Sequence, residues 1–240
     1  MKTLLVSETA TDTIKKLRAM GFDVVTCVRN PLLSDPISSH PDCAVFTPDN
    51  RTYFIEAGNY ENIVKYFTIG EGAGNWAGDR FIKIKETVKS PYPDDVILNC
   101  KAFGRKIICN TNAAASEIRI FAENNGFELI HCNQGYVGCS TVKLNDYAAI
   151  TDDESVFNVL KSNGTDCIRI SKGSVKLSGF DYGFIGGCCG LIDNKLYFNG
   201  SIELHRDCQQ IKSFLNKHSI DYENLFDYKL TDIGGIISIV

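Results

Sequence analysis

Short apolar runs separated by turn residues recur along the chain in one repeated order. In the plainest copy, two apolar strands at 136–144 and 147–151 flank the turn residues Asn145 and Asp146, which predicts a β-hairpin. A helix-forming segment follows, and Asp152 is expected at its N-cap. A further apolar strand then completes a unit of strand, strand, helix and strand.

Three further stretches repeat this order less plainly. Their first strands are predicted to begin at Asp42, at Asp95 and near Phe184. The helix of the last copy is expected from about Ser201 to His218, where apolar residues recur at helical spacing. A recurring unit of this size indicates a repeat architecture, in which each unit buries its apolar face against its neighbours.

The two ends of the chain complement each other. Residues 230–240 read as a strand with no helix after it, whereas residues 2–28 supply a strand, a helix and a strand without a hairpin partner. Joined, they make a fifth unit, so that a ring forms without exposed sheet edges. We therefore expect an α/β protein in which residues 1–240 form a single ring-shaped domain.

Composition and charge narrow the class of protein. Hydrophobic residues make up 44% of the 240 residues, which is enough for a buried core and excludes an intrinsically disordered chain. The formal net charge of −4 argues against binding along a phosphate backbone, so no nucleic-acid partner is expected. The first apolar run is too short for a secretion signal, and no stretch approaches the ~20 residues of a membrane span. We expect a cytoplasmic protein with no membrane partner.

The ten cysteines do not follow the spacing of a metal site. The sequence contains no CxxC, and its four histidines form no HxxxH pattern with the cysteines. Together with the expected cytoplasmic setting, this indicates reduced thiols, several of them in the core, and no metal.

A ring of five ββαβ units resembles the pentein, or α/β-propeller, fold. That fold is shared by guanidine-modifying enzymes and by a ribosome-binding translation initiation factor. Residues 41–58 are similar to the first hairpin of the dimethylarginine dimethylaminohydrolase branch, and residues 92–110 to its Gly-Gly-Asp strand. The resemblance implies that Asp42 and Asp95 bind a guanidinium, whose forked N–H donors suit a carboxylate.

The catalytic pair of that branch is missing at the matching positions. Val137 stands where the resemblance implies the acid/base histidine, and Ser238 stands at or beside the nucleophilic cysteine. Cys139, Cys188 and Cys189 lie on predicted first strands that line the channel, so we consider them relocated nucleophiles, together with Ser238. The alternatives are a soft-metal site, or small residues packing where the strands converge.

A glycine-rich segment outside the repeats contains the only tryptophan, Trp76, between the first and second full units. Family members carry a loop over the site here, so Trp76 is expected to cover the ligand; the alternative is a surface loop with Trp76 in the core. The segment does not match a dinucleotide-binding fingerprint, and no cofactor is expected. His205 and Asp207 form an HxD string, but on the predicted helix they would be solvated.

The sequence thus predicts a divergent pentein of the guanidino-modifying type. It would bind a small arginine-like ligand with a guanidino or amidino group in the central channel. Whether it is an enzyme is left open; as an enzyme it would be a hydrolase or an amidinotransferase acting on C–N bonds of guanidino compounds. The alternative is a non-catalytic pentein that binds a macromolecular partner such as a ribosomal particle. The sequence leaves open whether the protein forms a homodimer.

Overall fold

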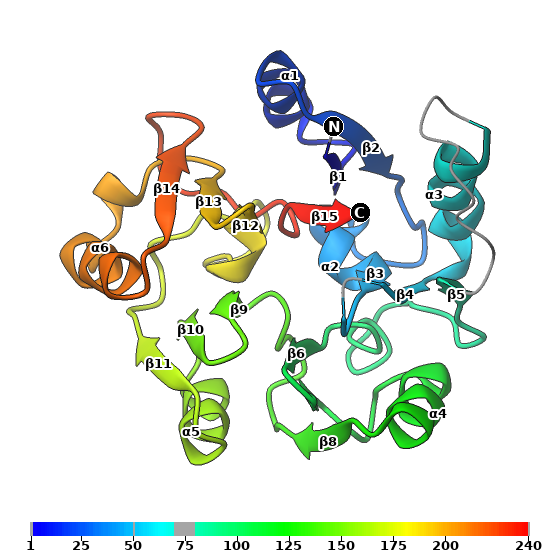
Figure 1. Ribbon diagram of the computed structural model, residues 1–240. Helices are drawn as coiled ribbons and strands as arrows, with labels where there is room; N and C mark the ends of the chain where they lie inside the picture. Colours follow the sequence, from blue (N-terminus) through cyan, green and yellow to red (C-terminus); the bar gives the residue numbers. More distant parts are fainter. Residues whose placement is uncertain (1, 50, 70–79, 240) are drawn as a thin grey trace.

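Five three-stranded sheets surround a central axis in the computed structural model, which describes residues 2–49, 51–69 and 80–239 (Figure 1). The strands are β1 (Thr3–Ser7), β2 (Asp23–Cys27), β3 (Val45–Phe46), β4 (Tyr53–Ile55), β5 (Phe81–Lys83), β6 (Lys101–Phe103), β7 (Lys106–Cys109), β8 (Glu128–His131), β9 (Thr141–Asn145), β10 (Ala148–Thr151), β11 (Asp166–Arg169), β12 (Cys189–Ile192), β13 (Lys195–Phe198), β14 (Asp221–Asn224) and β15 (Ile237–Ile239). The helices are α1 (Thr11–Ala19), α2 (Pro41–Ala44), α3 (Ala57–Ile69), α4 (Ser116–Asn125), α5 (Glu154–Ser162) and α6 (Cys208–Lys217), with short 3-10 turns η1 (Asp35–Ile37), η2 (Gly186–Cys188) and η3 (Ile202–Leu204).

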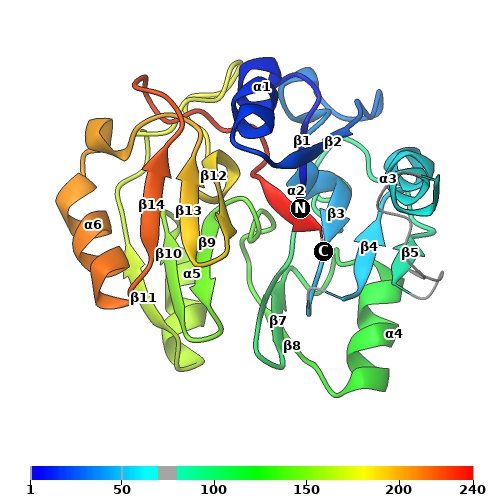
Figure 2. The same cartoon turned by 45° about the horizontal axis from the view of Figure 1, so that its top comes forward.

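Each sheet forms one blade with an inner, a middle and an outer strand. The inner strand pairs antiparallel with the middle strand, which pairs parallel with the outer strand after a helical crossover. The inner strands β15, β3, β6, β9 and β12 surround the axis, and the crossover helices lie at the periphery (Figures 1 and 2). Within the described ranges, no helix is long and apolar enough to cross a membrane.

Both ends of the chain build one blade. Strand β15 pairs antiparallel with β1, with Thr3 opposite Ile239 and Leu5 opposite Ile237, and β1 pairs parallel with β2. The prediction of five hairpin-and-helix units closed by the two ends of the chain is therefore confirmed.

Apolar side chains form five clusters in the described chain, and each cluster lies between two neighbouring blades. Because successive side chains of a strand point to opposite faces, one middle strand contributes to two clusters. On β1, Leu4 and Val6 pack toward the blade of β12, whereas Leu5 packs toward the blade of β3. Burial of each sheet therefore depends on both neighbours, and so on a complete ring.

Hydrogen bonds close a second, smaller ring around the axis, where the chain enters the inner strands. This axial ring joins all five blades in succession: Asp42 N donates to Gly234 O (3.1 Å), Asn99 Nδ2 to Asp42 O (3.2 Å), Cys139 N to Asn99 Oδ1 (3.1 Å), Gly187 N to Cys139 O (3.0 Å) and Gly235 N to Gly187 O (2.7 Å). Within this circuit Asn99 is the residue that links its neighbours through a side chain.

The axial ring leaves no room for side chains on its closest segment. A Cβ added at Gly186 would lie 2.6 Å from Cys139 O, and one at Gly187 would lie 2.1 Å from Asp232 Oδ1. Both distances are far inside van der Waals contact, so the close approach requires glycine. This agrees with the expectation that small residues pack where the strands converge.

All four predicted first strands begin later than their sequence pattern indicated, β9 only at Thr141 and β12 only at Cys189. Asp42 lies on helix α2, which Pro41 starts with its fixed φ, and the strand begins only at Val45. Asp95 lies in a turn rather than a strand, because Val96 N bonds back to Pro93 O and Asn99 N to Val96 O. The apolar residues that suggested a strand in these two segments are packed in the core, but their backbone forms a short helix or turns and not an extended strand.

The helix expected from Ser201 to His218 is interrupted. The turn η3 is followed by an extended His205, and α6 begins only at Cys208. His205 Nδ1 accepts from Asp207 N at 2.9 Å, which replaces a helical backbone bond. His205 is buried, contrary to the solvated position expected from the helix pattern.

The N-cap of α5 is Asp153 rather than Asp152. Asp153 Oδ1 accepts from Ser155 N (2.9 Å) and Val156 N (3.1 Å). Asp152 instead accepts from Ile185 N of the next blade at 2.9 Å, and burial raises its pKa to about 7 despite this bond and the nearby Lys172. The Asp152 carboxyl therefore links two blades and is costly to ionise.

Loss of the Asn99 side chain should weaken the axial ring. Asn99→Ala removes the bonds to Asp42 O and Cys139 N and leaves both groups buried, so we expect the free energy of unfolding to fall by about 3 kcal/mol. Urea unfolding measures the change. Asn125→Ala, which removes an exposed bond at the end of α4, is the matched control and should change stability little. Equal stability of the two variants would contradict a structural role for the axial ring.

Stability should also depend on the protonation of Asp152. Its pKa of about 7 in the folded chain lies above the unfolded value of about 4, so the folded chain holds one more proton between these pH values. The free energy of unfolding should therefore fall as pH rises from about 4 to 7. We expect this fall in the free energy of unfolding to be smaller in Asp152→Asn than in the unaltered protein, by up to about 4 kcal/mol. Urea unfolding of both proteins at pH 4.5 and at pH 8 measures the difference. Exposed Asp181→Asn should follow the unaltered protein, and a parallel profile for Asp152→Asn would refute the assignment.

Candidate functional site

A pocket of about 750 Å³ occupies the central channel between the inner strands of all five blades. At one end its lining consists of hairpin-turn residues, among them Asp49, Arg105 and Asp146, which are exposed. At the other end the lining consists of Asp42 and the glycines of the axial ring, which are buried or nearly so. The pocket therefore opens between the hairpin turns and is closed at the axial ring.

Three of the sequence-predicted site residues line this pocket: Asp42, Cys189 and Ser238. Cys100, directly before β6, lines it too. The hairpin register brings these residues together from the blades of β3, β12, β15 and β6, as the repeat pattern predicted for a shared channel.

The other predicted site residues lie elsewhere. Cys188 packs in the core between two blades, and its thiol donates to Ile185 O (3.1 Å). Asp95 is buried behind the pocket wall and accepts from the Tyr136 hydroxyl at 2.7 Å. Cys139 is buried in the axial ring, where its sulfur accepts from Asn99 Nδ2 at 2.9 Å. Trp76 lies outside the described residues and stays a prediction.

Asp42 is an unpaired carboxylate at the closed end of the pocket. Its side chain is 12% exposed, and neither carboxylate oxygen has a hydrogen-bond partner among the described residues. The neighbouring His40 Nδ1 approaches Oδ1 only to 4.0 Å, beyond hydrogen-bonding distance. A buried carboxylate normally accepts several hydrogen bonds, so Asp42 has unused acceptor capacity at this end of the pocket.

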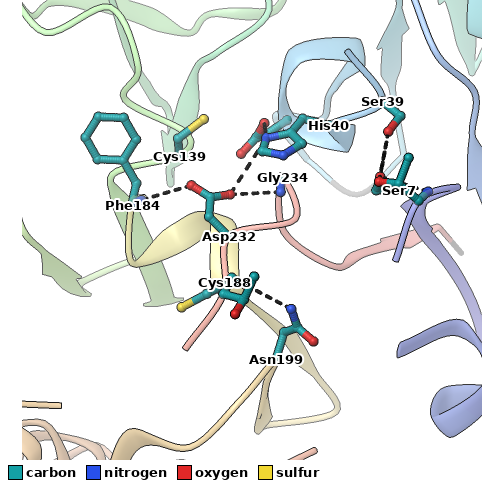
Figure 3. Close-up of polar contacts among 12 residues, drawn as sticks. Ser7, Ser39, His40, Cys139, Phe184, Cys188, Asn199, Asp232 and Gly234 are labelled. Carbon is teal, nitrogen blue, oxygen red and sulfur yellow. Dashed lines mark hydrogen bonds and ion pairs between the residues drawn. The ribbon is translucent and has the colours of Figure 1, made fainter. Parts of the chain in front are cut away.

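Sequence reasoning missed His40 and Asp232, which lie beside Asp42. His40 Nδ1 is 3.7 Å from Asp232 Oδ1, and Asp232 accepts from Phe184 N and Gly234 N, each at 2.9 Å (Figure 3). Burial raises the pKa of Asp232, and the nearby His40 opposes that shift. The signal in the sequence was that His40 precedes Asp42 by two residues, a spacing different from the HxxxH pattern of metal ligands.

Two of the predicted nucleophilic thiols, those of Cys139 and Cys188, are held in their neutral form. Burial raises the pKa of Cys139 well above its usual value, and the hydrogen bond with Cys43 and the charge of Asp42 add to the shift. The pKa of Cys188 is raised by burial and by its neighbour Cys189. Nucleophilic attack requires a thiolate, so neither Cys139 nor Cys188 is activated in the free protein. All ten cysteines are free and buried, as the expectation of reduced thiols requires.

The pocket wall also carries cations that sequence reasoning did not single out. Lys143 pairs with Asp146 at 2.7 Å, near the hairpin turns. Lys101 lies on β6 in the pocket wall and forms no hydrogen bond or ion pair with any residue that the structure describes. Burial lowers the pKa of Lys101, and the charge of Asp42 opposes this shift. Within the same part of the chain, no group of three His, Cys, Asp or Glu side chains is placed to hold a metal ion.

Comparison with protein families gives a match over almost the whole sequence. The model described as "Family of unknown function (DUF6873)" matches residues 5–237. The chain belongs to this family. No curated protein matches the sequence.

Solved structures similar to this DUF6873 chain share its five-bladed arrangement at low identity. Dimethylarginine dimethylaminohydrolase from Pseudomonas aeruginosa, in a complex with citrulline, has a TM-score of 0.56 and 8% identity over 93% of this chain and 91% of that chain. Agmatine deiminase from C. jejuni has a TM-score of 0.54 and 11% identity over 95% and 87%. The inosamine-phosphate amidinotransferase StrB1 from Streptomyces griseus has a TM-score of 0.51 and 12% identity over 97% and 80%.

These likenesses establish the pentein fold, as the resemblance in the sequence predicted. The catalytic pair does not follow with it. Val137 is fully buried in an apolar cluster between two blades, and Ser238 is a channel residue without a hydrogen-bonded base among the described residues. The DUF6873 chain therefore has the pentein fold without a histidine or cysteine at the two positions that the resemblance implies.

The thiols should react slowly in the folded protein. Because they are buried and the pKa values of Cys139 and Cys188 are raised, iodoacetamide at pH 7 should label no single cysteine rapidly, whereas the unfolded chain should take up label at all ten. Peptide mass spectrometry over time measures the rates. One cysteine labelled many times faster than the rest would identify an activated thiolate and contradict this assignment.

Proposed function

We propose that the central channel binds a small ligand with a guanidino or amidino cation, and that Asp42 accepts its N–H donors. The observation that carries the proposal is the Asp42 carboxylate, which lines the pocket with both oxygens unpaired. A planar guanidinium or amidinium presents parallel N–H donors that match the two oxygens of one carboxylate.

The cost of burying the Asp42 carboxylate without hydrogen-bond donors favours the binding of such a ligand. An ionised carboxylate that has lost water without gaining donors is costly, so a cation that supplies two donors recovers part of this cost. The axial ring fixes the backbone of Asp42 through its N and O atoms, which holds the carboxylate at the closed end of the pocket. The site is therefore organised before the ligand arrives.

The similar solved structures include enzymes named for guanidino compounds, one of them in a complex with citrulline. This supports the ligand class by analogy of fold, which alone does not fix function. We propose binding alone, because Cys139 and Cys188 are held as neutral thiols and Ser238 has no hydrogen-bonded base among the described residues. A cytoplasmic setting, in which thiols stay reduced, suits the ten free cysteines.

Thermal unfolding with a panel of cations tests the proposal. Arginine, agmatine and methylated arginines are added, with citrulline as the uncharged counterpart. A ligand that binds only the folded chain should raise the Tm by about 5 °C at a concentration of about 100 times its Kd, and citrulline should not.

The variant Asp42→Asn should abolish the ligand-dependent shift, because an amide no longer offers two anionic acceptors. Its Tm without ligand should equal or exceed that of the unaltered protein, since an unpaired buried charge is removed. Exposed Asp181→Asn is the matched control and should keep the shift. The proposal is wrong if no cation raises the Tm, or if Asp42→Asn still responds.

A further inference from the structure

The channel pocket contains more than one polar group without a partner. Besides Asp42, the Thr141 hydroxyl is buried with no hydrogen bond, and the Ser238 hydroxyl and the Lys101 ammonium form none with any described residue. These four side chains come from four different blades and line one cavity. Buried polar groups in proteins are normally paired, so a cavity lined by four unpaired ones indicates a polar ligand.

The other charged side chains that the structure describes in the pocket wall already have partners within the protein. Lys143 is paired with Asp146. Arg105 donates to Asn125 O at 2.9 Å and lies over the Phe127 ring at 4.9 Å. Asp49 accepts from backbone N–H groups of its own turn. Asp42 and Lys101 are therefore the two charged groups of the pocket that form no hydrogen bond with any described residue, one of each sign, and the ring of His40 lies 4.0 Å from Asp42 Oδ1.

Asp42 and Lys101 do not pair with each other. They are near enough for the carboxylate to act on the pKa of the ammonium, yet no nitrogen–oxygen distance between them falls within 4.0 Å. Each is held by its own inner segment, Asp42 by α2 and the axial ring, Lys101 by the pairing of β6 with β7. A gap between two fixed opposite charges suits a ligand that carries both charges with reversed polarity.

We propose that the channel ligand is a short zwitterion, and that Lys101 binds its anionic group while Asp42 binds its guanidino or amidino cation. The inference rests on the proposed function and adds the second end of the ligand. Thr141, on the neighbouring inner strand β9, and Ser238, on β15, supply hydroxyls that can donate to the same anion.

A carboxylate is the anion that this wall suits best. One ammonium with two hydroxyls offers enough donors for a single negative charge, whereas a phosphate dianion would meet only one free cation. A second cation on the ligand would instead face Lys101 and be repelled. Lys101 therefore selects guanidino acids over guanidino amines.

The test compares guanidino acids with their own amides, which have the same shape without the negative charge. Guanidinoacetate, 3-guanidinopropionate and 4-guanidinobutyrate are each titrated beside the matching amide by isothermal calorimetry. At the length that spans the gap, the acid should bind about tenfold to a hundredfold more tightly than its amide. In Lys101→Gln the two should bind equally, and the affinity of the amide should not fall.

Two variants control for charge and for folding. Lys101→Arg keeps a cation at the wall and should retain the preference for the acid. Lys161→Gln, on the outer helix α5, should change nothing. Urea unfolding of Lys101→Gln should show no loss of stability, because Lys101 forms no hydrogen bond or ion pair with any residue of the described ranges.

The outcomes separate this inference from the proposed function. If acid and amide bind equally at every length and both lose binding in Asp42→Asn, the guanidino site stands and the role of Lys101 is wrong. If the preference for the acid persists in Lys101→Gln, another group binds the anion and the inference also fails. If neither acid nor amide binds at all, the proposed function fails and the inference fails with it.

Discussion

The hydrogen-bonded ring around the axis is the constraint on which the rest of the molecule depends. It requires five backbone segments to approach so closely that Gly186 and Gly187 admit no Cβ. That approach sets the width of the channel, fixes the backbone of Asp42 and brings Asp232 against His40. The apolar clusters between the blades supply the burial energy, but the ring decides which polar groups meet.

Burial raises the pKa of the Asp232 carboxyl and of the Cys139 thiol alike in this low-dielectric region. Backbone N–H groups of Phe184 and Gly234 partly compensate the burial of Asp232, whereas Asp42 has no such donors. The thiol of Cys139 avoids the cost by staying protonated next to these charges. The channel therefore has anionic character from Asp42 and is ill suited to hold a thiolate beside it.

The sequence was sufficient for the architecture because the evidence for it is local. Turn residues between apolar runs marked the hairpins, and the unmatched first and last strands implied their pairing. The site was harder to predict. Asp42 was found through a family resemblance, but Lys101 looks like any polar residue of a short strand until the structure places it in the same pocket wall as Asp42. Asp95 and Cys188 were assigned to the site, and only the packed structure shows that Tyr136 and the core take up their side chains.

Pairing of β15 with β1 also constrains how the protein is made. The partners Thr3 and Ile239 are separated by almost the full sequence, so this contact carries one of the largest loop-closure entropies available to the chain. During synthesis the first blade lacks its inner strand until β15 emerges, and the apolar faces of Leu4 and Leu5 stay without the contacts of that strand on the nascent polypeptide. Folding thus ends with a late, non-local step, and the waiting intermediate exposes a strand edge that invites misassociation or chaperone capture.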